Sequence, residues 1–278
     1  MRRAHTKITG AALLSLLFGS ATADPQAGNE AQADAITGFV SSITRWDGDM
    51  IARWRIPVCP VVAGATAEQA EFIRSRILEL AIAVHAPASV DKQCEGNLLI
   101  FLTEHPDQLW AAWRDRYPKM FARESRQSIK RIVDPARPVV TWQNAALNAS
   151  GMPSSARGAD HAPEYRLSDS RFRGSVSEDF LSVIVVVNTS ATGQATFGQL
   201  ADYIAIVSLA RVDPRIEPEV DLAGAPTILK VFGKDFANAP RKLTNWDEAF
   251  LKGLYKGSDP LTRKRAEIVR TMRDELAQ

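Results

Sequence analysis

Two residues with side chains suited to proton transfer, Asp202 and Tyr203, lie in an otherwise apolar stretch, T-F-G-Q-L-A-D-Y-I-A-I-V-S-L-A-R-V-D-P at 196–214. An acid buried on an apolar helix can act as a general acid or base, and a phenol can donate a proton. The alternative role is structural, with Asp202 hydrogen-bonded to Gln199 or to a loop amide. The sequence therefore predicts that a functional pocket, if present, contains Asp202, Tyr203 and Gln199.

The chain contains two cysteines, Cys59 and Cys94. One alternative is a nucleophilic thiol with His85 or His105 as its base. However, Cys59 lies in I-P-V-C-P, a stiff extended segment and not a helix N-terminus that would activate a thiol. In an oxidising compartment an even pair of cysteines favours a disulfide. The chain-entropy model gives such a bond a stabilisation of roughly 3–4 kcal/mol. We expect a structural Cys59–Cys94 disulfide.

The histidines that could bind a metal are dispersed along the chain, at His85, His105 and His161. No two of them are three to five residues apart, and the H-E-x-x-H pattern of zinc proteases is absent. A zinc site assembled from all three is the alternative. A helix end for His85 and a polar loop for His161 explain them more simply. We therefore assign no metal ligand, no cofactor and no catalytic residue.

Other catalytic patterns are absent or have a simpler explanation. The sequence has no G-x-S-x-G, no P-loop and no G-x-G-x-x-G motif. The acid pairs Glu178-Asp179 and Glu217/Glu219 would suit a glycosidase, but their polar surroundings favour solvated loops. Tryptophans such as Trp110 and Trp113 would suit a ligand platform if they were exposed. The helical spacing of Trp113 from Leu109 favours core packing instead.

Helix starts and apolar runs predict the elements that would position these residues. Capping boxes at 66–69 and 196–199, and Thr244 with Asp247, mark three helix N-termini. The second of these helices should reach about Val212. Apolar runs predict strands at 97–103, 139–142 and 178–187. A segment rich in Asn, Ser, Gly and Pro predicts a long loop at 144–163. The fold class that we predict is α+β, helix-rich with a small central mixed sheet, in one globular domain over 35–278.

The N-terminus has the three parts of a secretory signal peptide over 1–23: a basic start, an apolar core and A-T-A before the cleavage point after Ala23. The apolar core is too short to span a bilayer, and no later segment is long and apolar enough. We therefore expect a periplasmic or secreted protein, with a flexible segment at 24–34. Without residues 1–23 the chain has 31 basic and 32 acidic residues, so no basic field favours nucleic acid or anionic membrane.

Two sets of residues carry a resemblance to known proteins. The strand and helix to Val212 are followed by A-P-T-I-L-K-V-F at 225–232 and L-T-N-W-D-E-A-F-L-K-G-L-Y at 243–255. This order resembles secreted bacterial proteins regarded as zincin-like, that is, shaped like metallopeptidases. The segments W-R-I-P-V-C-P at 54–60 and C-E-G-N-L at 94–98 resemble hallmarks of a related proteobacterial group of unknown function. The resemblance implies a zincin-like shape in the C-terminal third, with the helix at 197–212 in the active-site position.

The same resemblance implies that the position of the zincin metal site lacks metal-binding side chains in this chain. A zincin helix carries two histidines and a glutamate, whereas this helix has Asp202, Tyr203 and then apolar residues. The first hypothesis is an exported, non-catalytic envelope protein that acts by binding or packing, with an envelope protein or a small ligand as its partner. The alternative is an atypical hydrolase that uses Asp202 and Tyr203 beside the loop at 144–163.

Overall fold

The computed structural model describes residues 25–44, 51–91, 93–121, 125–148, 177–212, 224–233, 236–256 and 264–278. The expected signal peptide and its cleavage point after Ala23 lie outside these residues. So do His161, the acids Glu217 and Glu219, and the expected loop from residue 149 onward. Among the described helices, none combines the length and the apolar character that crossing a bilayer requires.

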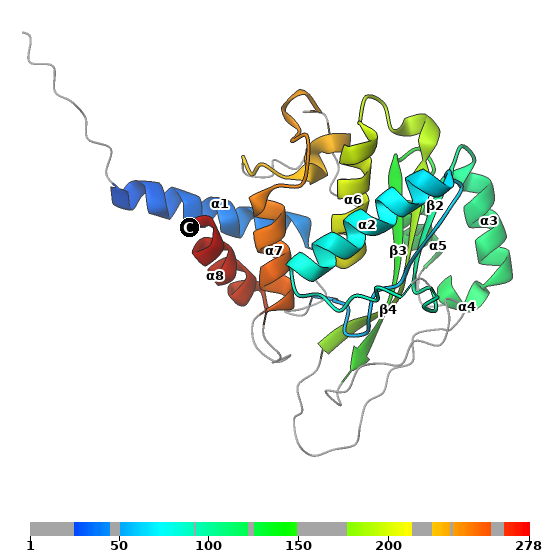
Figure 1. Cartoon of the computed structure of the whole chain (residues 1–278), viewed down its shortest axis with the longest axis horizontal. Helices are drawn as coiled ribbons and strands as arrows, with labels where there is room; N and C mark the ends of the chain where they lie inside the picture. Colours follow the sequence, from blue (N-terminus) through cyan, green and yellow to red (C-terminus); the bar gives the residue numbers. More distant parts are fainter. Residues whose placement is uncertain are drawn as a thin grey trace, which may run out of the picture.

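A four-stranded mixed sheet lies at the centre, with the strand order β1-β2-β4-β3 (Figure 1). β1, β2 and β4 are parallel, and β3 runs antiparallel to β4 at one edge. This mixture of helices with a small mixed sheet confirms the α+β prediction. The strands are β1 (Pro60–Ala63), β2 (Leu98–Thr103), β3 (Val139–Asn148) and β4 (Ser177–Asn188).

The apolar run of β4 is buried on both faces of the sheet. Val183, Val185 and Val187 belong to a large core on one face, while Ile184 and Val186 belong to a smaller core on the other. Successive side chains of a strand point to opposite faces, so a continuous apolar run suits a strand that is covered on both sides. β4 is therefore the strand around which both cores are built.

Helices cover both faces of this sheet (Figure 1). The smaller core packs under α3 (Pro106–Arg116), α4 (Pro118–Phe121) and α5 (Arg126–Ile132), and buries Trp110 and Trp142. The core-packing prediction is confirmed for Trp110, and Trp113 is half-buried beside it. The helices and short turns of the larger core are α1 (Pro25–Ile43), α2 (Ala67–Ala83), α6 (Phe197–Leu209), η2 (Ile228–Phe232), η3 (Phe236–Asn238), α7 (Asn245–Tyr255) and α8 (Lys264–Leu276). The turn η1 (Thr189–Ala191) follows β4 and has no buried residue.

The expected helix starts are confirmed. Reciprocal capping boxes join Thr66 to Gln69 at α2, Thr196 to Gln199 at α6, and Thr244 to Asp247 at α7. The end of α6 differs from the prediction, because the helix stops at Leu209 and not at about Val212. The next residues are extended, and Val212 forms an antiparallel bridge with Thr44.

Two other element boundaries also differ from the prediction. α1 begins at Pro25, so residues 25–34, which we expected to be flexible, are helical. This stretch contains three alanines, two glutamines and one glutamate, which are strong helix formers. β3 continues to Asn148 through residues that we had assigned to the loop at 144–163. The strand passes this polar point because the buried Asn144 side chain accepts a hydrogen bond from Trp142 Nε1 at 3.1 Å and donates one to Ser182 Oγ at 2.8 Å.

Candidate functional site

Helices α2 and α6 pack against each other on the same face of the sheet, with α2 in front of α6 in Figure 1. α2 connects the parallel strands β1 and β2, and α6 follows β4 after the short turn η1. α2 is the crossover between two parallel strands and covers one face of the sheet, and α6 packs on the same face. The topology therefore brings together α2 and α6, although they are far apart in the sequence.

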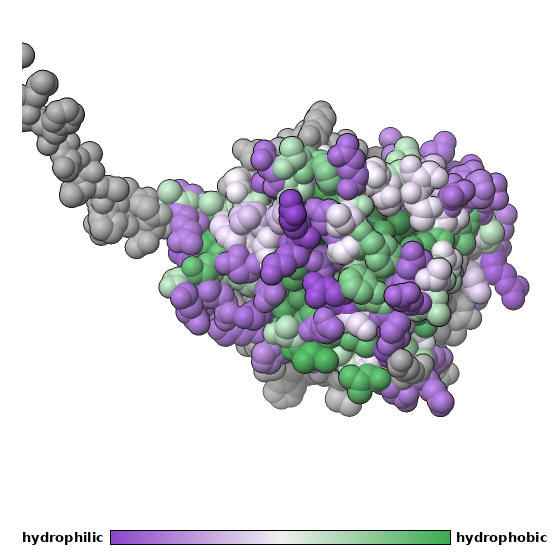
Figure 2. All heavy atoms as spheres, turned by 45° about the horizontal axis from the view of Figure 1, so that its top comes forward, coloured by the Kyte–Doolittle hydropathy of each residue, from purple (hydrophilic) through white to green (hydrophobic). Residues whose placement is uncertain are grey.

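A pocket of about 270 Å³ opens between these helices and the start of α7. This volume is slightly below the usual range for ligand sites of roughly 300–1,000 Å³, so it suits a small molecule. Figure 2 shows hydrophilic and hydrophobic side chains intermixed on the face of the molecule that is turned forward there. The lining residues come from three segments: Arg76, Glu79, Leu80 and Ala83 of α2, Asp202 and Ala205 of α6, and Lys242, Leu243 and Glu248.

The carboxylate of Asp202 lies in the wall of this pocket, with both oxygens hydrogen-bonded. Arg76 donates to Oδ1 from Nε at 2.8 Å and from Nη2 at 2.5 Å. The backbone N–H of Leu243 donates to Oδ2 at 2.8 Å. The Asp202 side chain is 4% exposed. The expected structural role, a hydrogen bond to a loop amide, is therefore present, and the same group also faces the pocket.

Arg76 connects Asp202 to the solvent side of the pocket. Its guanidinium also contacts Glu79 at 3.3 Å, one turn along α2. Partial burial alone would lower the pKa of Arg76, but the hydrogen bonds and charge of Asp202 outweigh it and raise that pKa. The Arg76 guanidinium therefore stays protonated, and its contact with Asp202 joins α2 to α6.

Replacing Asp202 with alanine is expected to lower the free energy of unfolding by about 2–3 kcal/mol. The change removes the acceptor of the Leu243 N–H and the counter-ion of Arg76. Arg76 is about one-third exposed, so water compensates part of its loss. Urea denaturation of Asp202→Ala, Arg76→Ala and the double variant would measure the coupling between the two residues. Purely additive effects would contradict a direct interaction.

Gln199 and Tyr203 do not line the pocket with Asp202. The amide of Gln199 closes the capping box with Thr196 and donates to the Pro240 carbonyl at 2.8 Å. The ring of Tyr203 packs edge-on against Phe232 of η2, with the ring centroids 4.8 Å apart. Consecutive side chains on a helix point about 100° apart. The structure therefore separates the acid and the phenol that the hydrolase hypothesis pairs.

Burial raises the pKa of the Tyr203 phenol to about 12. An unfolded tyrosine releases its proton near pH 10, so between about pH 10 and 12 the unfolded chain loses this proton first. The contribution of Tyr203 to stability is therefore expected to be complete below pH 10 and to fall as the pH rises toward 12. Urea denaturation across this range should give a shallower pH dependence for Tyr203→Phe than for the wild type. Equal slopes would contradict the burial of this phenol.

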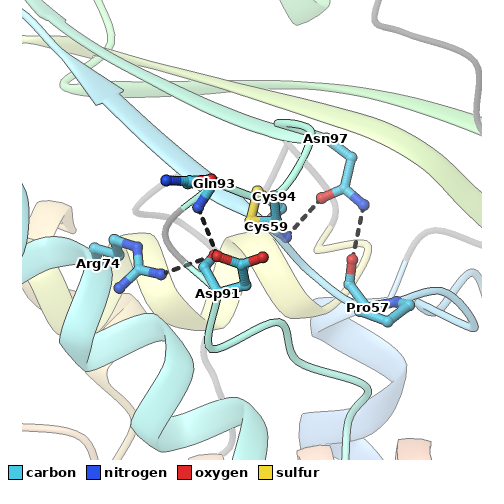
Figure 3. The surroundings of a disulfide bond; sticks show 7 residues. All are labelled: Pro57, Cys59, Arg74, Asp91, Gln93, Cys94 and Asn97. Carbon is cyan, nitrogen blue, oxygen red and sulfur yellow. Dashed lines mark hydrogen bonds between the residues drawn. A yellow bond between two sulfur atoms is a disulfide. The ribbon is translucent and has the colours of Figure 1, made fainter.

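The disulfide prediction is confirmed. Cys59 and Cys94 are bonded, with their Cα atoms 6.0 Å apart. Figure 3 shows the Asn97 side chain beside them, accepting from the Cys59 N–H at 2.8 Å and donating to the Pro57 carbonyl at 2.9 Å. The described part of the chain contains no free thiol. The alternative of a nucleophilic Cys59 is therefore excluded in this oxidised form.

The other sequence candidates lie apart from the pocket. His85 is exposed at the end of α2, and His105 is exposed at the start of α3. Among the described residues, no group of three His, Cys, Asp or Glu side chains is arranged to hold a metal ion. The prediction of a solvated loop at Glu178-Asp179 is wrong, because both residues lie on β4.

The carboxylates of Glu178 and Asp179 lie in the folded strand because distant arginines pair with them. Asp179 is 1% exposed, and the Arg55 guanidinium approaches it at 4.0 Å. Glu178 forms an ion pair with Arg211, beyond the end of α6. Buried charges are stable only when they are paired in this way, and nothing in the local sequence pattern identifies a partner so far along the chain. The local sequence pattern likewise does not identify Arg76, Lys242 and Glu248 as pocket residues, and the sequence analysis missed them.

Comparison of the chain with protein-family models, with curated proteins and with solved structures finds no match.

Proposed function

We propose that this chain is an exported envelope protein that acts by binding a small ligand in the pocket between α2, α6 and the start of α7, and not by catalysis. The observation that carries the proposal is the state of Asp202 inside that pocket. Its two oxygens accept three hydrogen bonds, from Arg76 and from Leu243. A general base needs a lone pair directed at the proton that it removes, whereas three of the roughly four lone-pair sites of this carboxylate already accept from fixed donors.

The rest of the pocket also suits binding. Ligand sites are concave and combine apolar walls with a few placed polar groups, and this lining has four apolar and five charged residues. The compartment follows from the expected signal peptide and agrees with the disulfide, which is typical of exported proteins. Expression in a bacterial host should yield an exported chain that begins at Asp24, measured by intact mass.

We also propose, from the resemblance described above, that the shape is zincin-like and lacks the metal ligands. Support comes from the order of elements, since β4 leads into α6, η2 follows, and α7 begins within L-T-x-x-D. Metal analysis of the purified protein should find far less than one equivalent of zinc. One tightly held equivalent would contradict both the empty site and the non-catalytic proposal.

A pocket-blocking variant tests the binding proposal. Ala83 is exposed at the end of α2 and lines the pocket, so Ala83→Phe should fill it without disturbing the core. The matched control is Ala112→Phe on the exposed side of α3. Thermal unfolding would be followed with amino acids, dipeptides, monosaccharides, nucleosides and inorganic phosphate as probes. At least one probe should stabilise the wild type and the control but not Ala83→Phe. If no probe distinguishes the variants, the proposal fails.

The hydrolase alternative has its own test. p-Nitrophenyl acetate and a casein digest would be incubated with the wild type and with Asp202→Asn. We expect no difference between the two proteins and no rate above background. A loss of more than about tenfold in Asp202→Asn, with retained folding, would favour the hydrolase hypothesis over binding.

A further inference from the structure

Two opposite charges in the pocket have no side-chain partner among the described residues. Arg76, Asp202 and Glu79 are paired with one another. By contrast, the side chains of Lys242 and Glu248 have neither a hydrogen bond nor an ion pair to any residue in the described part of the chain. Lys242 is exposed and Glu248 is half-buried. Within the part of the chain that the structure describes, the pocket thus presents an ammonium and a carboxylate without a polar partner.

The remaining lining limits the size and character of a ligand. The lining also contains the apolar side chains Leu80, Ala83, Ala205 and Leu243. A simple anion would meet three acids in this lining, and a simple cation would meet two bases. A ligand that carries both charges can pair with Lys242 and Glu248 at once. A short aliphatic group would then cover the apolar wall.

We propose that the pocket binds a small zwitterion with an aliphatic side chain, of the size of an amino acid or a dipeptide. This inference rests on the proposed binding function. The carboxylate of the ligand accepts from Lys242, and its ammonium donates to Glu248, so both contacts are charge-assisted hydrogen bonds. Removing one partner of such a contact typically weakens binding by about tenfold or more.

The competing explanation for Glu248 is local. An acid in the first turn of a helix stabilises the helix dipole, and Glu248 lies in the first turn of α7. That role would affect the stability of the protein but not the chemical form of its ligand. A matched set of ligands therefore separates the two explanations.

The experiment is calorimetric titration with L-leucine and L-alanyl-L-leucine, compared with N-acetyl-L-leucine, which lacks the ammonium, and L-leucinamide, which lacks the carboxylate. At least one zwitterion should bind, and both analogues should bind about tenfold or more weakly. Glu248→Gln should weaken the zwitterion by about tenfold but leave the N-acetyl form unchanged. Lys242→Gln should also weaken binding of the zwitterion by about tenfold but leave the affinity for L-leucinamide unchanged. The controls are Glu104→Gln and Lys119→Gln, which are exposed and lie outside the pocket.

Each outcome has a definite meaning. Zwitterion binding that is lost in Ala83→Phe and in both charge variants supports the inference. Analogues that bind as tightly as their parent, or no binding of either zwitterion, overturn it. If another probe binds and Ala83→Phe abolishes that binding, the binding function stands while the zwitterion inference fails. If no probe binds at all, both proposals fail.

Discussion

Replacing Cys59 and Cys94 with alanine is expected to lower the free energy of unfolding by about 3–4 kcal/mol. The bond joins residues 35 positions apart, so its loss releases a long loop of the unfolded chain and increases that chain's conformational entropy. The loop contains β1 and α2, which includes the pocket residues Arg76 and Glu79. Urea denaturation of the double variant and of the oxidised wild type measures the difference.

Reduction of the wild type provides the control for packing changes at the two sites. Cys59 is 2% exposed, so its replacement by alanine also changes the core slightly. Adding dithiothreitol should therefore shift the wild type most of the way to the double variant and should leave the variant unchanged. Equal stability of the reduced and oxidised wild type would contradict a stabilising role for the bond.

The local signals of the sequence identified the helix starts correctly because capping is a short-range interaction. Thr196 and Gln199 are three residues apart and satisfy each other's backbone N–H groups. The end of α6 depends instead on a distant contact, since Val212 pairs with Thr44. Short-range chemistry was therefore sufficient for the start of this helix and insufficient for its end.

Only some of the pocket residues could be predicted from the sequence. Asp202 stood out as an acid on an apolar helix, but its partner Arg76 lies 126 positions away and looked like an ordinary surface charge of α2. Lys242 and Glu248 gave no signal, because only the packing of their segment over α2 and α6 makes them neighbours of Asp202. Tyr203 was adjacent to Asp202 in sequence, yet the helix directs it to η2. Helical geometry and tertiary packing, and not residue type, decide which of these groups share a site.

Replacing Asp247 with alanine is expected to cost about 3–5 kcal/mol, because the carboxylate is fully buried and joins two segments of the larger core. Its Oδ1 accepts from Thr227 Oγ1 at 2.5 Å. Its Oδ2 accepts from the backbone N–H groups of Ile228 and Thr244, both at 3.0 Å. The truncated variant leaves these donors buried without an acceptor, and it removes half of the capping box of α7.

The conservative variant Asp247→Asn separates the hydrogen bonds from the charge. Burial raises the pKa of Asp247, and its hydrogen bonds only partly oppose this shift. The negative charge should therefore contribute less to stability than the hydrogen bonds do. An asparagine oxygen can still accept from the backbone N–H groups, and its amide can donate to the Thr227 hydroxyl. We therefore expect Asp247→Asn to cost about 1–2 kcal/mol in urea denaturation, well below Asp247→Ala.

The same residue has a consequence for the pocket. Thr244, which caps α7 with Asp247, follows directly on Lys242 and Leu243. Weakening the cap should loosen the segment whose amide binds Asp202. Hydrogen exchange of the Leu243 amide should therefore accelerate in Asp247→Ala and stay close to wild type in Asp247→Asn. An unchanged rate in Asp247→Ala would mean that Arg76 and Asp202 hold this segment without the cap of α7.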